Sequence, residues 1–418
     1  MKRLYVWVRR ADGNITLAGE LATTDPAVDG RFESEFEYTA EWTRDPTAIS
    51  LDPISLPLQP HGRRFHTEQL YPPLAVFDDS LPDDWGRRLL AKALTREGRT
   101  PSPPEMLLAL RGAGTGALVF TETPSPPQLM CTLETRSLAT LLSAASKFEA
   151  GTLPQDDDFR MLLEGSSRAG GARPKALVHD EEGEWIAKFP SRTRDGGYDV
   201  VGLEATCLEL AGRAGLTVPE ARLRTVGRTR VLLVRRFDVT EVGGRSHMVS
   251  MRTLCRERPG VYVTSYTDLA LGLSKCSASP AKDVAALFRH MTFNAAVGNV
   301  DDHLKNFWML ASADGYQLAP AFDLVPDITE RRDHTLSFHF GFACPTREAL
   351  LAVARDWRVG QAEKLIDRII EVVRTFRATA LKLRVRPGRR LDGICADVSR
   401  RVALLAGQRP AARGGRSP

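Results

Sequence analysis

One stretch of the sequence decides the expected fold and chemistry: Gly298-Asn299-Val300-Asp301-Asp302-His303-Leu304-Lys305-Asn306, followed by Ala321-Phe322-Asp323-Leu324. It places a carboxylate at Asp301, an amide five positions later at Asn306, and a further carboxylate at Asp323. Carboxylate and amide oxygens are ligands that Mg²⁺ prefers, and a free carboxylate can also accept a proton. The other long segments have the pattern of ordinary core, so we expect the chemistry here.

The Asp-x-x-x-x-Asn spacing is the one that protein kinases use in His-Arg-Asp-x-x-x-x-Asn. It predicts a phosphotransferase that depends on ATP and Mg²⁺, with Asp301 as the base and Asn306 and Asp323 as metal ligands. Lys305 is placed to neutralise the transferring phosphate. His303 either braces the loop or contacts the nucleotide. Asp302 is expected to face solvent or to cap a turn.

A cluster of small residues, 165–175, precedes a strand and indicates a phosphate-binding loop. Small residues let backbone amides approach an anion closely, and Lys175 adds positive charge. After a hairpin turn at 180–183, Lys188 ends an apolar strand, as the lysine of the Val-Ala-Ile-Lys motif does. The predicted ATP-binding residues are Gly170, Gly171, Ala172, Arg173, Lys175, Lys188, Glu204, Arg235, Phe237 and His303.

Two further segments complete this prediction. Glu204 lies on the edge of the apolar face of a helix expected over 201–213, where it is either the partner that orients Lys188 or an exposed carboxylate. The apolar run 231–234 reads as a buried strand that delivers residues 235–238 to a hinge between lobes. At such a hinge, the backbone can pair with adenine.

Several other motifs have structural readings. The glycine-rich stretch 111–118 has no helix after it to receive a phosphate, so we expect a structural role. Phe77-Asp78-Asp79-Ser80-Leu81-Pro82-Asp83 is a turn before a core helix, and an aspartate near the start of that helix can cap it. His290 is expected in the core. The C-terminal arginines favour a solvated helix face over a nucleic-acid site.

Length and composition indicate a globular protein with two or three domains or lobes. The chain has 418 residues, of which 43% are hydrophobic and 26% charged, with a net charge of +5. Six cysteines without C-x-x-C pairing suggest reduced thiols, and no apolar run is long enough to span a membrane, so we expect a cytoplasmic protein.

The order of strand-like and helical segments predicts an α+β, protein-kinase-like, two-lobed fold with a β-rich N-lobe, a helical C-lobe and a small additional N-terminal α+β subdomain. The expected units are an N-terminal subdomain at 1–125, an N-lobe with the phosphate loop and ATP lysine at 126–240, a helical C-lobe with the catalytic loop at 241–408, and a disordered basic tail at 409–418.

These motifs together resemble those of HipA-type serine/threonine kinases, the toxin components of bacterial toxin–antitoxin pairs. The stretch 298–306 with Phe322-Asp323 is similar to the family's Gly-Asn-x-Asp-x-His-x-Lys-Asn and Tyr-Asp motifs, with Phe322 in place of Tyr. Segments 170–175, 186–190 and 235–238 are similar to its phosphate loop, ATP lysine and hinge, and 77–83 resembles the turn of its N-terminal subdomain.

The resemblance implies that this chain transfers the ATP γ-phosphate to a serine or threonine of a translation-related protein, an aminoacyl-tRNA synthetase being one candidate. It also implies autophosphorylation just before the phosphate loop, where Ser166 and Ser167 are candidates, although this match is displaced by one residue. A partner antitoxin of helix-turn-helix type would restrain the kinase and contact DNA, so the chain itself would meet DNA only indirectly.

Two alternatives stay open at this point. Asp301-x-His303-x-x-Asn306 also resembles the loop of phosphoinositide kinases, so a small-molecule or lipid kinase is one rival. The other is a catalytically idle nucleotide-binding co-repressor that acts with its antitoxin.

Overall fold

The computed structural model describes most of the chain. The described residues are 2–24, 32–69, 75–95, 101–112, 114–129, 133–152, 156–166, 172–256, 265–331, 333–338 and 341–408. Within these ranges the chain forms three sheets and a large helical region. None of the helices in these ranges has the length and apolar character needed to cross a membrane.

The N-terminal domain is built on a five-stranded antiparallel sheet in the order β4-β3-β2-β1-β5. Leu4, Val6 and Val8 alternate along β1 and are buried, because one face of the sheet is covered. Its elements are β1 (Lys2–Arg9), β2 (Ile15–Thr23), β3 (Phe32–Tyr38), α1 (Ala40–Arg44), β4 (Arg64–Gln69), α2 (Ala75–Asp78), α3 (Asp84–Leu94), α4 (Pro103–Ala109) and β5 (Leu118–Thr121).

The N-lobe contains the second sheet, in the order β6-β7-β8-β10-β9. Strand β6 runs parallel to β7, and the other pairs are antiparallel. Its elements are β6 (Leu133–Glu134), a 3₁₀ turn (Thr135–Ser137), α5 (Leu138–Glu149), α6 (Asp156–Ser166), β7 (Lys175–Asp180), β8 (Gly183–Lys188), α7 (Val200–Arg213), β9 (Ala221–Val226) and β10 (Thr229–Arg235).

Both faces of this second sheet are covered, which explains the unbroken apolar run in β10. Val231 and Leu233 pack with Trp185 into a core shared with α5 and α6. Leu232 and Val234 point the other way and join the main core, to which α7 belongs. Because side chains alternate along a strand, Lys188 lies on the same face of β8 as α7, opposite to Trp185 and Ala187.

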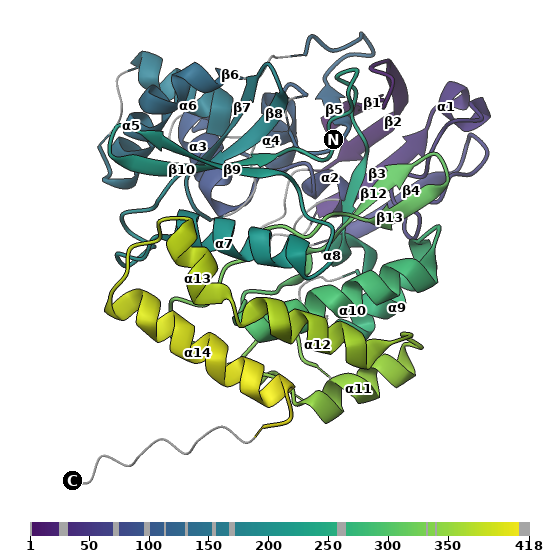
Figure 1. Cartoon of the computed structure of the whole chain (residues 1–418). Coiled ribbons are helices and arrows are strands. Elements are labelled where there is room, and N and C mark those ends of the chain that lie inside the picture. The colour runs from purple at the N-terminus through teal and green to yellow at the C-terminus, as the bar shows by residue number, and fades with distance from the viewer. Residues whose placement is uncertain are drawn as a thin grey trace.

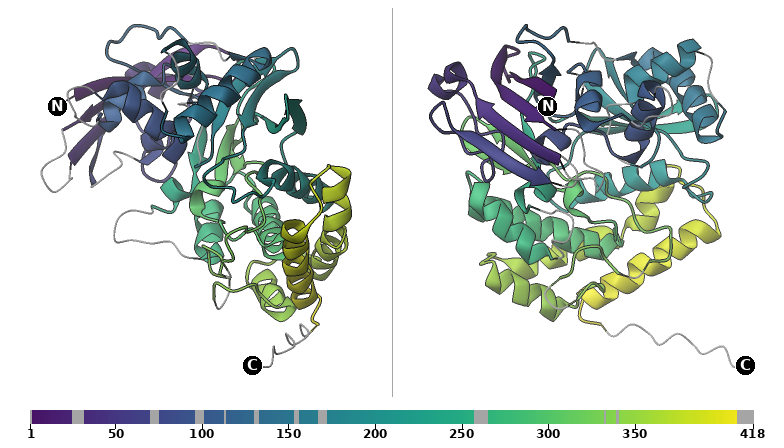
Figure 2. Two further views of the ribbon diagram at one scale, coloured as in Figure 1. Left: turned by 90° about the vertical axis from the view of Figure 1, so that its left-hand side faces the viewer. Right: turned by 180° about the vertical axis from the view of Figure 1, so that it is seen from behind.

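The C-lobe is mostly helical and carries a small sheet in the order β11-β12-β13. Figure 2 shows the first two sheets at one end of the molecule and the long helices at the other. Its elements are β11 (Met248–Ser250), α8 (Met251–Leu254), α9 (Tyr266–Cys276), α10 (Pro280–Val297), a 3₁₀ turn (Leu304–Asn306), β12 (Trp308–Ser312), β13 (Gly315–Leu318), α11 (Arg347–Asp356), α12 (Ala362–Val373), α13 (Phe376–Lys382) and α14 (Arg389–Leu405).

Two helices place the expected site between the lobes. Helix α7 packs against β9 and β10 on one side and against α12 and α13 on the other (Figure 1), so it connects the lobes. Helix α10 ends at Gly298, whose φ of 74° is left-handed. A side chain there would also come within 2.9 Å of Arg401 in α14, so both the backbone and the packing favour glycine.

The helix expected over 201–213 and the strand expected over 231–234 are confirmed as α7 and β10. Near the C-terminus, α12 and α13 are separate helices with a short break between them. The break falls at Thr375, whose Oγ1 donates to the carbonyl of Val372 at 2.7 Å. The predicted domain boundaries stay predictions, and the tail at 409–418 lies outside the described residues.

Candidate active site

Lys188 is the centre of a charged cluster that joins three distant segments. Its Nζ donates to Asp323 Oδ1 at 2.8 Å and also to Glu204 Oε1 of α7. The exposed fractions are 12% for the Lys188 side chain, 5% for Glu204 and 38% for Asp323, so only Asp323 opens to solvent. Glu204 is therefore the partner of Lys188 and not an exposed helix carboxylate.

Burial and the neighbouring charges shift the pKa of all three members of this cluster. Burial lowers the pKa of Lys188, but Asp323 and Glu204 outweigh burial and raise it overall. The Lys188 ammonium holds the pKa of Asp323 well below its usual range. Burial dominates at Glu204 and raises its pKa, against the opposing charge of Lys188. Lys188 and Asp323 are thus ionised at neutral pH.

Lys175 lies directly across the hairpin from Lys188, at the paired position of β7. It is only 6% exposed. Burial lowers the pKa of Lys175, and the neighbouring charge of Lys188 lowers it further. Like charges at directly opposite positions destabilise a sheet unless an anion or carboxylates lie between them. The arrangement fits a phosphate-binding site.

Asp323 is held in an unusual backbone conformation. Its φ is 56°, in the left-handed region that residues other than glycine rarely adopt. Such conformations persist where the surrounding structure enforces them, and they gather at functional sites. Here the strained backbone presents the Asp323 carboxylate to Lys188.

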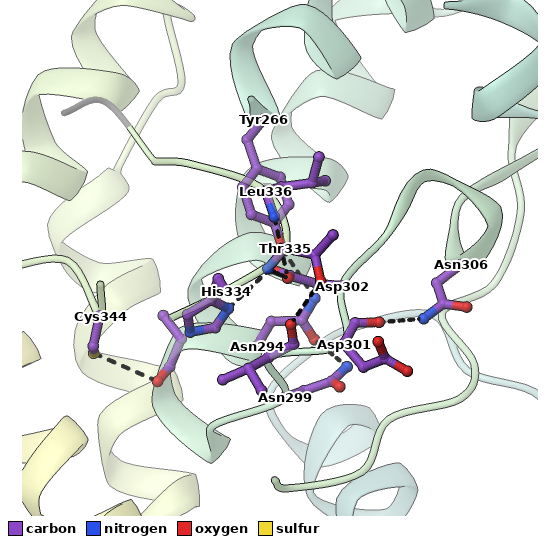
Figure 3. Close-up of polar contacts among 12 residues, drawn as sticks. Tyr266, Asn294, Asn299, Asp301, Asp302, Asn306, His334, Thr335, Leu336 and Cys344 are labelled. Atoms are coloured by element: carbon purple, nitrogen blue, oxygen red, sulfur yellow. Dashed lines mark hydrogen bonds and ion pairs between the residues drawn. The ribbon is translucent and has the colours of Figure 1, made fainter. Parts of the chain in front are cut away.

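The catalytic loop begins directly after the left-handed end of α10 (Figure 3). The Asp301 side chain is 70% exposed, and one of its oxygens accepts from Arg331 at 3.1 Å. Asn306 Nδ2 donates to the Asp301 backbone carbonyl at 2.7 Å, so the amide closes the loop and leaves its own oxygen available. The loop therefore offers one open carboxylate and one oriented amide oxygen.

Asp302 is buried, and the expectation that it faces solvent or caps a turn is wrong. It is 0% exposed. Its Oδ2 accepts from Tyr266 Oη at 2.6 Å and from His334 Nδ1 at 2.9 Å, while Oδ1 accepts the backbone N–H of Thr335 at 2.8 Å (Figure 3). A buried carboxylate needs such partners, so Asp302 ties the catalytic loop to residues 334–336.

The Asp302 contacts extend to the last helix. Arg401 of α14 lies 3.2 Å from His334 Nε2, and because arginine can only donate, His334 carries its hydrogen on Nδ1. Arg401 Nε in turn donates to Asp397 at 2.7 Å. On the other side, Asn294 Nδ2 of α10 donates to the Tyr266 hydroxyl at 3.1 Å. The catalytic loop is therefore braced by α9, α10 and α14.

The described part of the phosphate loop is anchored by one ion pair. Arg173 Nε donates to the buried Asp195 at 2.8 Å. Ser166 is the last residue of α6. The predicted residues Ser167, Gly170 and Gly171 lie outside the described residues, and Ala172 is the first described residue after them.

The hinge brings two aromatic rings together and uses its arginines for other contacts. The rings of Phe237 and Phe322 are 5.8 Å apart. Arg235 bonds to Glu220 at 3.2 Å and lies over Trp185. Arg236 bonds to Asp238 and to the Gly114 carbonyl at 2.9 Å. The glycine-rich stretch 111–118 thus contributes to a contact with the hinge, as its structural reading predicts.

Two oxygens of the predicted metal ligands are of the kind that holds a magnesium ion jointly with phosphates. Asp323 Oδ2 and Asn306 Oδ1 have no bond to any other described residue, and both are hard oxygen ligands. The described chain contains no group of three or more histidine, cysteine or acidic side chains that could hold a metal alone. Mg²⁺ usually binds through one or two protein oxygens plus substrate phosphates, so the donor set fits it.

The sequence matches two domains of one family. The HipA N-terminal domain matches residues 12–121. The HipA-like C-terminal domain matches residues 167–380, just over half of the chain. The chain belongs to the HipA family. The resemblance carried by the catalytic loop is therefore confirmed.

HipA relatives match along much of the chain. "Putative kinase Y4mE" of Sinorhizobium fredii is 27% identical over 323 residues, covering 70% of this chain and 72% of the relative. The similarly named Y4dM of the same organism is 29% identical over 216 residues, covering 47% and 51%. These names support a kinase.

The HipA fold extends over the whole chain. A solved structure of the Shewanella oneidensis MR-1 toxin–antitoxin system, HipA and HipB with operator DNA, has a TM-score of 0.68 to this chain. The two chains are 17% identical, and the match covers 97% of this chain and 98% of the Shewanella chain. The predicted kinase-like fold with an added N-terminal domain is confirmed.

Within this HipA fold, the predicted site residues that contact one another form one cluster around Lys188 and one pair in the catalytic loop. Lys188, Glu204 and Asp323 meet directly, and Asn306 bonds to Asp301. The His303 side chain has no bond among the described residues, and the roles of all predicted residues stay predictions. The sequence did not point to Arg331, Asp195 or the Asp302 partners, because each lies far along the chain from the residue that it contacts.

Lys305 has a partner that comes from the N-terminal domain. Its Nζ donates to Asp83 Oδ1 at 2.6 Å, although 222 positions separate the two residues. Asp83 belongs to the turn 77–83, which resembles a motif of the family's N-terminal subdomain. That resemblance is the one sequence feature that points to Asp83.

Proposed function

We propose that this HipA-family chain is a cytoplasmic serine/threonine protein kinase that depends on ATP and Mg²⁺ and acts as a toxin. The observation that carries the proposal is the convergence of Glu204 and Asp323 on Lys188, together with a loop that exposes Asp301 to solvent. A lysine oriented by a helix glutamate, with two metal-type oxygens nearby, is the arrangement needed to hold a triphosphate.

In the proposed reaction, Lys188 and Lys175 bind the phosphates of ATP, and the paired Phe237 and Phe322 rings pack against one side of the adenine. Asp323 and Asn306 would hold Mg²⁺, which would supply positive charge to neutralise the phosphates of ATP. Glu204 keeps Lys188 in place before ATP arrives, because its carboxylate is buried against the ammonium. The cluster is thus assembled for binding before the nucleotide enters.

Asp301 serves the acceptor side of the proposed transfer. Its exposed carboxylate orients a serine or threonine hydroxyl and takes its proton. The hydroxyl oxygen forms a bond to the γ-phosphorus while the bond to the β-bridging oxygen breaks and ADP leaves. Because this transition state is loose, it requires positioning more than a strong base, which suits a solvent-exposed aspartate.

The family match supports a proposal for the substrate and the partner. We propose a translation-related protein substrate, such as an aminoacyl-tRNA synthetase, with Ser166 or Ser167 as candidate sites of autophosphorylation. A DNA-binding antitoxin of helix-turn-helix type would restrain the kinase. Support for such a partner comes from the Shewanella oneidensis assembly, in which HipA occurs with HipB and operator DNA.

Labelled ATP tests the proposal directly. The purified chain and its Asp301→Asn variant are incubated with γ-labelled ATP, Mg²⁺ and a bacterial lysate, and labelled proteins are identified. We expect label on serine or threonine of a translation protein, lost in the variant by about a thousandfold. Growth inhibition on overexpression should disappear in the same variant.

Other outcomes identify the rivals. Label found only in lipids or small molecules would replace the protein-kinase proposal with a small-molecule kinase. Nucleotide binding without any transfer, together with toxicity that persists in Asp301→Asn, would instead indicate an idle co-repressor.

A further inference from the structure

We propose that Asp83, a residue of the N-terminal domain, is a positioning residue for phosphoryl transfer that acts by holding Lys305 of the catalytic loop. This inference rests on the proposed kinase function. It gives the N-terminal domain a direct part in the active site, in addition to any contact with a partner.

The first argument is that the Asp83 side chain does not cap α3, although Asp83 occupies the capping position. It is the N-cap of α3, with extended backbone angles, but its side chain makes no cap bond to the helix. An aspartate at this position normally accepts an N–H of the first turn. Instead, Asp83 Oδ1 accepts from Lys305 Nζ at 2.6 Å.

The second argument is that this ion pair lies in a sheltered place beside the phosphate site. The Lys305 side chain is 17% exposed and that of Asp83 is 34% exposed. Burial raises the pKa of Asp83, but the charges of Lys305 and Lys175 outweigh burial and lower the pKa overall. The Asp83 carboxylate therefore interacts electrostatically with both Lys305 of the catalytic loop and Lys175 of the phosphate loop.

The third argument is that the turn carrying Asp83 is fixed to the same scaffold as the catalytic loop. The buried Asp79 accepts from the Ser250 hydroxyl at 2.7 Å and from its backbone N–H at 2.8 Å, at the start of α8. The first residue of α8, Met251, donates its N–H to the Phe307 carbonyl at 2.8 Å, one residue after Asn306. The turn and the loop are thus held together by short, buried hydrogen bonds.

A further pair holds the other side of the turn. The buried Asp78 bonds to Arg87 at 2.5 Å and to Arg252 of α8 at 3.3 Å. The distance from Asp83 to Lys305 therefore depends on rigid elements. An ammonium has three donors, so Asp83 can fix the direction of Lys305 and leave two donors for the transferring phosphate.

The test compares adjacent aspartates in the full chain. Asp83→Asn removes the charge with little change in size. Asp84→Asn is the matched control, because Asp84 is 47% exposed and bonds to the surface residue Arg194 at 2.5 Å. We expect Asp83→Asn to lower kcat by about 10- to 100-fold while KM for ATP changes by less than about twofold. Asp84→Asn should match the wild type, and Asp83→Glu should recover part of the loss.

A double variant separates positioning from general damage. In a Lys305→Met background, Asp83→Asn should cause no further loss of kcat, because its effect passes through Lys305. A full additional loss in that background, or a normal kcat in Asp83→Asn, would overturn the inference. If the wild type and Asp84→Asn both transfer no phosphate, the proposed function itself fails, and this inference fails with it.

Discussion

The nucleotide side and the acceptor side of the candidate site are built in opposite ways. Around Lys188, a buried glutamate and a strained aspartate are already paired, and the cluster joins a strand, a helix and a loop. Asp301 has an exposed carboxylate whose one ion pair, with Arg331, is also at the surface. The difference suggests that ATP enters a site formed in advance, whereas the acceptor side stays open for a large substrate.

Breaking the enclosed side should have the largest effect. Lys188→Ala removes the proposed phosphate contact and leaves Glu204 buried beside Asp323 without its cation. We expect the Kd for ATP to rise by about 10- to 100-fold in calorimetry. The free energy of unfolding should also fall, by about 3 kcal/mol in urea titrations.

The open side supplies the control for that variant. Asp301→Asn should leave both ATP affinity and stability close to wild type, because this side chain is 70% exposed and its ion pair lies at the surface. Equal losses in both variants would contradict the contrast between the two sides.

A second prediction concerns the two adjacent aspartates of the catalytic loop. Asp302→Asn keeps the shape but puts an amide donor where Tyr266 and His334 both donate. We expect kcat to fall by about 10- to 100-fold and the free energy of unfolding to fall by about 2 kcal/mol. ATP affinity should hold, because Lys188 is anchored separately.

The exposed Asp333 offers a matched control for Asp302. Asp333→Asn lies beside His334 and should change neither kcat nor stability. An Asp302→Asn enzyme with normal kcat would show that the loop needs no brace from residues 334–336.

The smallest expected effect is a dependence of ATP affinity on pH. Burial and Lys188 lower the pKa of Lys175, whereas the partners of Lys188 raise the pKa of Lys188. As pH rises above neutral, Lys175 should lose its proton before Lys188 does, and a neutral lysine binds phosphate less well. Affinity is thus greatest below the pKa of Lys175 and falls above it, by at most about tenfold.

Calorimetry at several pH values checks this prediction. The Lys175→Met variant should bind ATP more weakly at neutral pH and show a flatter pH profile than wild type. A profile with the same slope in both proteins would show that another group titrates.

The sequence predicted the residues whose order and spacing are local. The catalytic loop, the strand ending at Lys188, and the helix carrying Glu204 each have a short-range pattern, and their order in the chain suggested a kinase-like site. The pairing of Lys188 with Glu204 was one of two open readings. The structure decides it, because only packing shows which helix face meets β8.

The features that the sequence did not predict depend on contacts between distant segments. Asp302 resembles its exposed neighbour in every local respect, and its partners lie 32 to 36 positions away. The Asp83–Lys305 pair spans two domains. No proline or glycine marks the break before α13. There the Thr375 hydroxyl bonds to the backbone carbonyl of Val372. Local patterns contain no information about such partners.

The contact between His334 and Arg401 has a consequence for the timing of synthesis. Helix α14 is the last helix described in the chain, and it completes the hydrogen-bond chain that reaches Asp302. A polypeptide still emerging from the ribosome lacks this support until Arg401 has left the exit tunnel. The proposed kinase activity would therefore begin only after the segment that carries Arg401 has been synthesised and has folded onto His334.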